Sequence, residues 1–311
     1  MSSLTIGIAG ITGKFGRLVA LKLLQNPNVN LRGYARDPSK VITSISESPR
    51  VSLFKGEAFD NASIKPFVAG ANVIICAYLG ADHLMIEGQK KLIDACDDAG
   101  VARYVASDWA LDYTKLKLGE LFPKDPMIHV KSYLETKKTT KGVHILIGSF
   151  MDPVLSPFFN IWDPQSQTLR YWGEGDEPFE GTSYENAAEL TAAVAVDKSA
   201  VGIKKYLGDR KTIKEIASTF KKVYGVKPNL ERLGSLEDLK TKMHALREKN
   251  SADIYSYMPL FFTYYWLNGQ TFVSPETDNE QYKDVKPETW EDFLSKRTLE
   301  QLPHAYFSLA N

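Results

Sequence analysis

The feature that most constrains this chain is a glycine-rich turn close to its first residues. An apolar run, Leu4 to Ala9, leads into Gly10-Ile-Thr-Gly13-Lys-Phe-Gly16, and apolar residues at helical spacing follow from residue 15 to residue 24. Glycines at a strand-to-helix turn let the backbone turn tightly and let a phosphate approach the free N–H groups of the helix N-terminus. The pattern therefore predicts a dinucleotide site, with a purely structural turn as the alternative.

The order of the apolar segments predicts the fold class. Further strands are expected at 30–35, 51–54, 71–76, 102–106 and 143–148, and helices at 83–99 and 126–141. The nearly continuous apolar run at 71–76 is typical of a parallel strand covered on both faces. This alternation predicts an α/β fold with a Rossmann-type, doubly wound parallel sheet. Its ligand would lie at the carboxyl ends of the strands, near the switch point between the first and fourth strands.

The character of the sequence changes at about residue 150. Residues 150–181 are rich in aromatic residues, Pro and Gly without a clear period. Beyond them, a helix is expected at 184–196, a short strand at 204–207, a helix at 212–224 and a mostly helical, aromatic tail at 235–300. We therefore expect residues 1–150 to form an NAD(P)-binding domain that parts of 183–225 complete. Residues 151–182 and 226–311 are expected to form a smaller substrate lobe.

Composition excludes several classes of partner. Lys and Arg number 38, as do Asp and Glu, so no net basic field attracts nucleic acid. Cys76 and Cys96 fall in apolar segments and are expected to be reduced core thiols, and no histidine has the spacing of a zinc ligand, so no metal site is expected. No leader is recognised before the first strand, and no apolar stretch reaches the roughly 20 residues of a spanning helix. We expect a cytoplasmic protein with no membrane partner.

The residue after the second expected strand indicates which dinucleotide is bound. NAD sites place an acidic residue there, whereas NADP sites place a cation nearby. Arg36 stands at this point, and its guanidinium suits a phosphate, while Lys14 and Lys40 could reach the same region. The pattern favours NADP(H). Because of the neighbouring Asp37, NAD(H) stays open, as does a plain surface role for Arg36.

Several segments together resemble the NmrA-like branch of the atypical short-chain dehydrogenases, close to the isoflavone reductase-like group. They are the glycine turn, Arg36-Asp37-Pro38, residues 71–77, residues 104–109, Lys131, residues 171–175, residues 279–287 and residues 289–293. The resemblance implies a Rossmann domain with a small, mostly C-terminal substrate lobe. It also implies hydride transfer from NADPH to an activated C=C, C=O or quinone-type carbon of a small aromatic or polyketide-like metabolite, with secondary metabolism as the setting.

The resemblance further implies the site residues. The family lysine that matches Lys131 binds the nicotinamide ribose and assists proton transfer, a task suited to a lysine whose pKa is lowered by desolvation. The residues expected to hold the cofactor are Gly10, Thr12, Gly13, Lys14, Phe15, Gly16, Arg36, Ala77, Ser107, Lys131 and Phe150. Those expected to line the substrate pocket are Trp109, His129, Phe158 and Trp162.

One departure from the family pattern keeps other functions open. Short-chain dehydrogenases have a tyrosine four residues before the lysine, and here that position is Met127. Its absence fits a non-catalytic NAD(P) sensor of the NmrA type, and a non-redox isomerase or dehydratase on the same fold is a third hypothesis. Lys131 and the aromatic lobe favour the enzyme. A small aromatic substrate is the expected partner, and the sequence is compatible with a homodimer.

Overall fold

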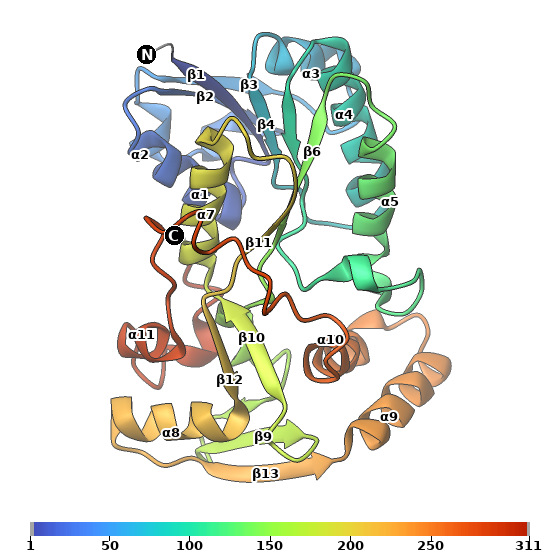
Figure 1. The fold of residues 1–311 in the computed structure, drawn as a ribbon, viewed down its shortest axis with the longest axis vertical. Coiled ribbons are helices and arrows are strands. Elements are labelled where there is room, and N and C mark those ends of the chain that lie inside the picture. The colour runs from blue at the N-terminus through green and yellow to red at the C-terminus, as the bar shows by residue number, and fades with distance from the viewer. Residues whose placement is uncertain (1–2, 310–311) are drawn as a thin grey trace.

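A seven-stranded parallel sheet forms the upper half of the molecule in Figure 1. The computed structural model describes residues 3–309, so residues 1–2 and 310–311, at the ends of the two expected units, lie outside the described residues. The strands lie in the order β11-β6-β5-β4-β1-β2-β3. Their bounds are β1 Leu4–Ala9, β2 Val29–Ala35, β3 Val51–Lys55, β4 Val73–Cys76, β5 Arg103–Val105, β6 Lys141–Leu146 and β11 Gly202–Lys205.

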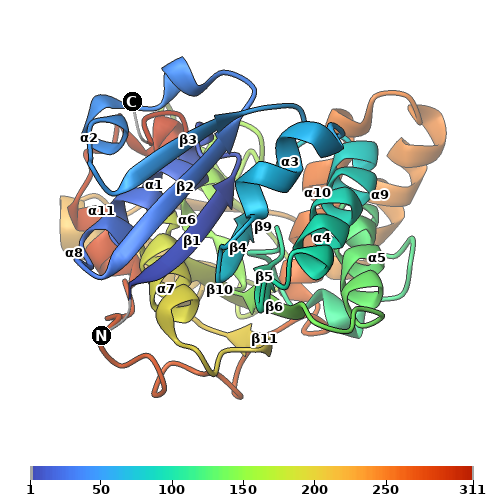
Figure 2. The same cartoon turned by 90° about the horizontal axis from the view of Figure 1, so that it is seen from above.

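Helices cover both faces of this sheet, as Figure 2 shows from above. One face carries α1 (Lys14–Leu24), α2 (Thr43–Ser46) and α7 (Tyr184–Val196), and the other carries α3 (Asn61–Val68), α4 (Gln89–Asp98) and α5 (Asp125–Leu134). Successive β4 residues point to opposite faces of the sheet. Ile75 therefore packs in the core under α1 and α7, and Ile74 packs in the core under α3 and α4. Both faces are covered, which explains why this strand is apolar at every position.

The order in which strands are added to the sheet reverses at β1. The chain first runs outward through β2 to β3 and then returns to the other side of β1 at β4. The loops that follow β1 and β4 therefore diverge at their carboxyl ends, which opens a crevice there. The predicted Rossmann-type sheet and its switch point between the first and fourth strands are confirmed.

A smaller lobe lies below the sheet in Figure 1. It contains the three-stranded sheets β12-β10-β7 and β13-β9-β8. Its strands are β7 Ser149–Phe150, β8 Trp162–Asp163, β9 Thr168–Trp172, β10 Pro178–Thr182, β12 Asp209–Thr212 and β13 Asn229–Gly234. Its helices are α6 Met151–Val154, α8 Ile213–Tyr224, α9 Leu236–Lys249, α10 Met258–Leu267 and α11 Trp290–Ser295. These elements share a core in which Phe220, Phe261 and Phe293 are fully buried.

Two expectations about regular structure were wrong in part. The helix expected at 126–141 ends at Leu134, because Asp97 of α4 accepts hydrogen bonds from the N–H groups of Thr139 and Thr140 at 2.8 Å each and draws this segment out of the helix. Residues 150–181, which show no period, contain β8, β9 and β10. The tail, expected to be mostly helical, is α-helical only in α9, α10 and α11, with a 3₁₀ turn at Ile254–Ser256 and other turns between them.

Other expectations concern the chemistry of the chain as a whole. Cys76 and Cys96 are both buried, and neither forms a disulfide. Within residues 3–309 no helix combines the length and the apolar character needed to cross a membrane. The helix at Met258–Leu267, the most apolar segment of the tail, instead forms a wall of the lobe core.

Candidate dinucleotide and substrate site

A cleft of about 500 Å³ opens at the carboxyl ends of β1, β2, β3 and β4. It lies where the crevice of an open parallel sheet binds ligands. Its lining residues are Gly10, Thr12, Gly13, Tyr34, Ala35, Arg36, Gly56, Glu57, Ala58, Phe59, Ala77, Tyr78, Leu79 and Leu84. Of the residues predicted to hold the cofactor, this set includes Gly10, Thr12, Gly13, Arg36 and Ala77.

The glycine turn needs glycine for physical reasons. Gly10 has φ +87°, and a Cβ there would lie 2.7 Å from the carbonyl oxygen of Ala77. At Gly16 a Cβ would lie 2.4 Å from the carbonyl oxygen of Gly10, so any side chain would push the helix away from the turn. Gly13 precedes α1, and no side chain caps this helix end. The first N–H groups of α1 are thus left for an anion in the cleft.

The charged residues after β2 are arranged for a phosphate. Arg36 is exposed and lines the cleft. The Asp37 carboxylate instead accepts hydrogen bonds from Ser39, at 3.2 Å from its N–H and 2.6 Å from its hydroxyl, and these bonds lower the pKa of Asp37. Asp37 thus caps the turn that follows and, unlike Arg36, is not among the residues that line the cleft.

Tyr78 supplies a further test of whether a dinucleotide fits. It follows β4 and lines the cleft, yet its hydroxyl is buried without a hydrogen-bond partner among residues 3–309. Burying an unpartnered hydroxyl costs free energy that a polar ligand would recover. The sequence reasoning missed Tyr78, although its position directly after Ala77 at the end of a buried strand was a usable signal.

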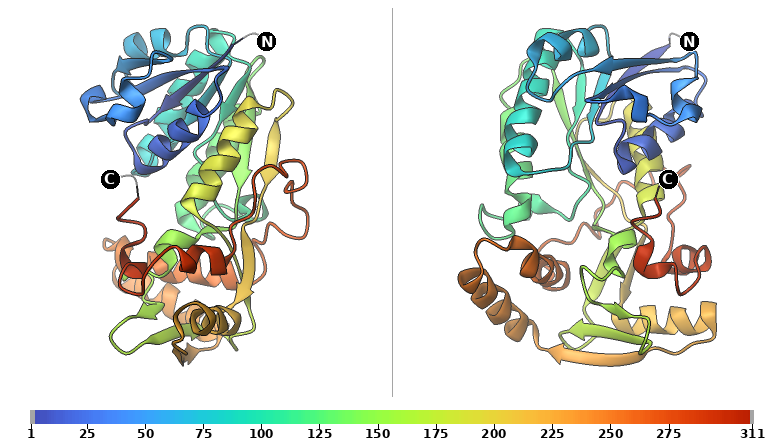
Figure 3. Two further views of the ribbon diagram at one scale, coloured as in Figure 1. Left: turned by 90° about the vertical axis from the view of Figure 1, so that its left-hand side faces the viewer. Right: turned by 180° about the vertical axis from the view of Figure 1, so that it is seen from behind.

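Lys14 was expected to hold the cofactor, but it is not among the residues that line the cleft. Its ammonium donates hydrogen bonds to the carbonyl oxygens of Phe307 and Leu309, at 2.8 and 3.1 Å. Residues 307–309 therefore lie beside α1, and Figure 3 shows the last described segment close to this helix. These two hydrogen bonds join residues that are 293 and 295 positions apart in the sequence, which explains why the local motif did not reveal them.

An aromatic pocket of about 140 Å³ adjoins the glycine turn. We call it the Lys124 pocket; its lining residues are Trp109, Ala110, Leu111, Lys124, Gly148, Ser149, Phe150, Pro153, Phe159, Phe262 and Trp266. Phe15 of the glycine turn packs against this pocket, since its ring centroid lies 4.3 Å from that of Trp109 and 5.7 Å from that of Phe150. Trp109 and Phe150 were both expected at the site.

Trp109 is held in an unusual backbone conformation. Its φ is +32°, a region that residues with a side chain rarely adopt. The indole N–H donates a hydrogen bond to the Thr191 hydroxyl at 2.8 Å, which ties the residue to α7. Such conformations cluster at ligand sites because the surrounding structure must hold them in place.

Lys124 carries the chemistry of this pocket. It directly precedes α5, and its ammonium lies 5.3 Å from the centroid of the Phe262 ring. Burial against the rings lowers the pKa of Lys124 to about 8, and the charge of Asp108 opposes this shift. A lysine in this state exchanges protons near neutral pH. The sequence reasoning missed Lys124, although Pro126 marks a helix start directly after it.

Asp108 belongs to a buried polar cluster behind Lys124. One of its carboxylate oxygens accepts a hydrogen bond from the Tyr113 hydroxyl at 3.0 Å and lies 2.7 Å from Nδ1 of His144. Burial raises the pKa of Tyr113, so the phenol stays protonated as a donor. The second carboxylate oxygen of Asp108 is buried without a partner among the described residues.

Lys131, the expected catalytic residue, lies outside the Lys124 pocket. It lies in the last turn of α5, about 10 Å further along the helix axis than Lys124. Its ammonium pairs with Glu135, and it lines a separate hollow with Lys137, Lys141 and other residues near β11. Because α5 begins directly after Lys124, this lysine, rather than Lys131, stands at the carboxyl edge of the sheet.

Four other expected residues are also absent from the linings of the cleft and the Lys124 pocket. The Ser107 hydroxyl donates to the carbonyl oxygen of Tyr78 at 2.7 Å and so supports the cleft wall. His129 points to solvent from α5, and Phe158 is 40% exposed. Trp162 is buried against Phe220 in the lobe core, with ring centroids 4.9 Å apart. Nor does any cluster of His, Cys, Asp and Glu within residues 3–309 have the makings of a metal site.

Comparison with known proteins finds matches mainly in the first half of the chain. Residues 10–152 match a family model described as NAD(P)H-binding. An NmrA-like family domain-containing oxidoreductase of Gibberella moniliformis is 25% identical over 158 residues, which cover 50% of this chain and 52% of that protein. The isoflavone reductase homolog IRL of Zea mays is 36% identical over 119 residues, which cover 36% of this chain and 38% of that protein. The chain thus spans about half of these curated relatives or less.

The fold has a close counterpart among solved structures. The crystal structure of isoflavone reductase superposes with a TM-score of 0.79 at 18% identity, covering 95% of this chain and 99% of the other. At this identity the likeness concerns the fold. Together with the sequence matches, it confirms the resemblance that the motifs predicted. Residues 10–152 are thus similar to NAD(P)H-binding domains, and the chain is similar in sequence to NmrA-like and isoflavone reductase-like proteins and in fold to isoflavone reductase.

Proposed function

We propose that this protein is an NADPH-dependent reductase of a small aromatic molecule. One observation carries the proposal: Lys124, whose pKa is lowered to about 8, lies in an aromatic pocket that adjoins the glycine turn. A purely structural domain has no need of a half-buried amine set against an aromatic ring, because taking a charged group out of water costs free energy. The names of the relatives, an oxidoreductase and an isoflavone reductase homolog, agree with this function.

The residues of the cleft would bind the cofactor. The N–H groups at the start of α1 would hold its pyrophosphate, and the exposed guanidinium of Arg36 would hold a 2′-phosphate. The hydroxyl of Tyr78 would gain a hydrogen-bond partner. When bound, NADPH supplies a hydride. The arrangement of Arg36 and Asp37 favours NADPH over NADH, because the only carboxylate of this turn is engaged by Ser39.

The residues of the Lys124 pocket would position the substrate and supply a proton. Trp109, Phe150 and Phe262 offer ring faces to a flat aromatic molecule and exclude water from it. The Lys124 ammonium would donate a proton to the substrate oxygen or carbon that becomes negative as reduction proceeds. Asp108 would favour the protonated amine between turnovers. We assign to Lys124 the proton-transfer role expected of Lys131.

Calorimetric titration with NADPH and NADH tests the cofactor assignment. We expect Arg36→Glu to weaken NADPH binding by roughly tenfold to a hundredfold, because a bidentate phosphate contact is lost and a like charge introduced. NADH binding should be unaffected or stronger. Lys40→Glu is the matched control, since Lys40 is also exposed after β2 but does not line the cleft.

NADPH oxidation with aromatic enones, aldehydes and quinones then tests the reductase. Turnover of any of these acceptors, abolished in the Lys124→Met variant, would support the proposal. Tight NADPH binding without turnover of any acceptor would refute the reductase and favour the sensor. Absence of binding by either nucleotide would reject both and make the glycine turn a structural feature.

A further inference from the structure

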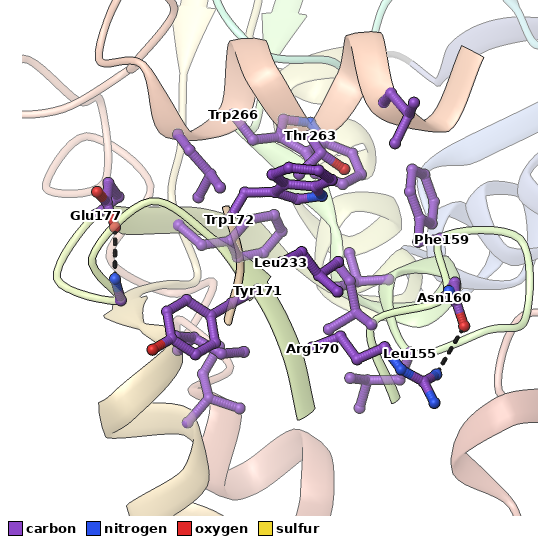
Figure 4. A pocket seen from close by; sticks show the side chains of 18 of the residues that line it. Leu155, Phe159, Asn160, Arg170, Tyr171, Trp172, Glu177, Leu233, Thr263 and Trp266 are labelled. Atoms are coloured by element: carbon purple, nitrogen blue, oxygen red, sulfur yellow. Dashed lines mark hydrogen bonds between the residues drawn. The ribbon is translucent and has the colours of Figure 1, made fainter. Parts of the chain in front are cut away.

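A second apolar pocket lies inside the lobe, between β9 and α10 (Figure 4). In this view Trp172 of β9 faces Thr263 and Trp266 of α10 across it. We call it the lobe pocket. Its lining is mostly apolar and comprises Val154, Leu155, Phe159, Asn160, Ile161, Arg170, Tyr171, Trp172, Gly175, Glu177, Phe179, Ile213, Ile216, Leu233, Leu260, Thr263, Trp266, Leu267 and Trp290.

The lobe pocket is separated from the Lys124 pocket by two aromatic rings. Phe159 and Trp266 line both pockets, and their ring centroids lie 4.6 Å apart. The Trp266 ring is held in turn by Phe179, whose ring meets it edge to face at 5.3 Å. A molecule in the lobe pocket would therefore contact the far side of the rings that bound the Lys124 pocket, without approaching Lys124 itself.

The charged residues at the rim are satisfied within the protein. Arg170 donates hydrogen bonds to Asn160 at 2.8 Å, Asp163 at 2.7 Å and Glu231 at 3.0 Å. The Glu177 carboxylate accepts from two backbone N–H groups of the turn before it, each at 2.8 Å. Figure 4 shows both groups at opposite sides of the pocket. Since these charges are already paired, the rim offers little to an ionic ligand.

One polar group of the lining lacks a partner. Trp290, the first residue of α11, is fully buried, and its indole N–H has no hydrogen-bond partner within the described chain. Buried N–H groups are almost always bonded, because leaving one unpaired costs its full desolvation. A ligand oxygen able to accept one hydrogen bond would remove that cost.

We propose that the lobe pocket binds a small, uncharged ring compound that carries one hydrogen-bond acceptor, of the phenol or aryl ketone class. Its ring would pack among Trp172, Trp266 and Phe179, and its oxygen would accept from the Trp290 indole N–H. The volume open to the centre of a water-sized sphere is about 60 Å³, whereas a single water needs roughly 10–15 Å³ on the same measure. Leu233 at the rim, which is 39% exposed, marks the side from which a ligand enters.

The test uses phenol and toluene, which share a ring but differ in the acceptor. The chain has five tryptophans, so its indole N–H signals form a small set that Trp→Phe variants assign in a ¹H–¹⁵N spectrum. Phenol should shift the Trp290 signal and bind more tightly than toluene. Trp290→Phe should weaken phenol binding roughly three- to tenfold, the worth of one hydrogen bond, and leave toluene unaffected.

Two further variants make the result decisive. Trp162→Phe is the matched control, because its indole N–H is also buried and unpartnered but lies outside the pocket lining. It should change neither affinity. Leu233→Trp at the rim should abolish binding of both compounds while leaving NADPH binding intact, which separates this proposal from the reductase. Failure of phenol and toluene to bind, or shifts confined to Trp109 in the Lys124 pocket, would overturn the proposal.

Discussion

Replacing Lys124 separates the two lysines that compete for the proton-transfer role. Burial among the rings of the Lys124 pocket lowers the pKa of this lysine from 10.5 to about 8. The surroundings thus disfavour the ammonium by about 3 kcal/mol relative to water, which makes it a stronger acid. Lys124→Met keeps the apolar length of the side chain and removes the proton. Lys131→Met is the matched control, because Lys131 lies on the same helix but pairs with Glu135 elsewhere.

We expect Lys124→Met to lower kcat/KM by about 10²- to 10⁴-fold, the usual contribution of a positioned acid. This corresponds to about 3–5 kcal/mol of transition-state stabilisation. NADPH affinity should change little, since Lys124 does not line the cleft. Lys131→Met should leave kcat/KM within about twofold, because its ion pair is at the surface and contributes little.

The assay is NADPH oxidation, followed at 340 nm as a function of pH, about one unit at a time. An acid must be protonated to act, so kcat/KM should be flat below pH 8 and fall about tenfold per unit above it. Lys124→Arg keeps a charge at every pH of the assay and should remove this break along with most of the activity. Activity retained in Lys124→Met but lost in Lys131→Met, or a break near pH 8 that persists in Lys124→Met, would refute the assignment.

Three other substitutions test the cleft and the core. Gly16→Ala should abolish NADPH binding, measured by calorimetry, because its Cβ would lie 2.4 Å from the carbonyl oxygen of Gly10; intact binding would show that the turn adapts. Tyr78→Phe should stabilise the ligand-free protein to urea by about 1 kcal/mol and weaken NADPH binding, and a loss of stability would contradict an unpartnered hydroxyl. Burial raises the pKa of Asp152 from 3.8 to about 6. The folded protein therefore binds this proton more tightly than the unfolded chain does, and it loses stability as the pH rises from about 4 to 6. Relative to Asp152→Asn, the wild-type unfolding free energy in urea should fall by about 2–3 kcal/mol over that range, and parallel profiles would exclude the shift.

Local pattern was sufficient for the parts of the fold whose causes are local. The Leu4–Ala9 strand, the glycine turn and the helix after it were predictable because positive φ and close backbone approach demand glycine at Gly10 and Gly16. The buried strand at Val73–Cys76 was predictable because both of its faces are covered. The position of Arg36 after β2 followed from the same regular alternation.

Contacts between distant segments decided the rest of the site. Lys124 stands at the carboxyl edge because α5 begins directly after it and carries Lys131 about 10 Å away along the helix axis. Only the packed structure shows that aromatic residues of the lobe, Phe159, Phe262 and Trp266, meet Lys124 there. The parallel partner of β9 is β13, about 60 residues later, so neither strand stands out in its own segment.

The sequence by itself determined the nucleotide-binding half of this protein, including its glycine cradle and the charge beside it, because short-range sterics and periodicity dictate those features. Only the tertiary structure decided the chemistry: it set the half-buried Lys124 against the Phe262 ring and left the hydroxyl of Tyr78 and the indole N–H of Trp290 without partners within residues 3–309. Burial and hydrogen-bond satisfaction are properties of a residue's neighbours in space, and those neighbours are contributed by segments far away in the chain.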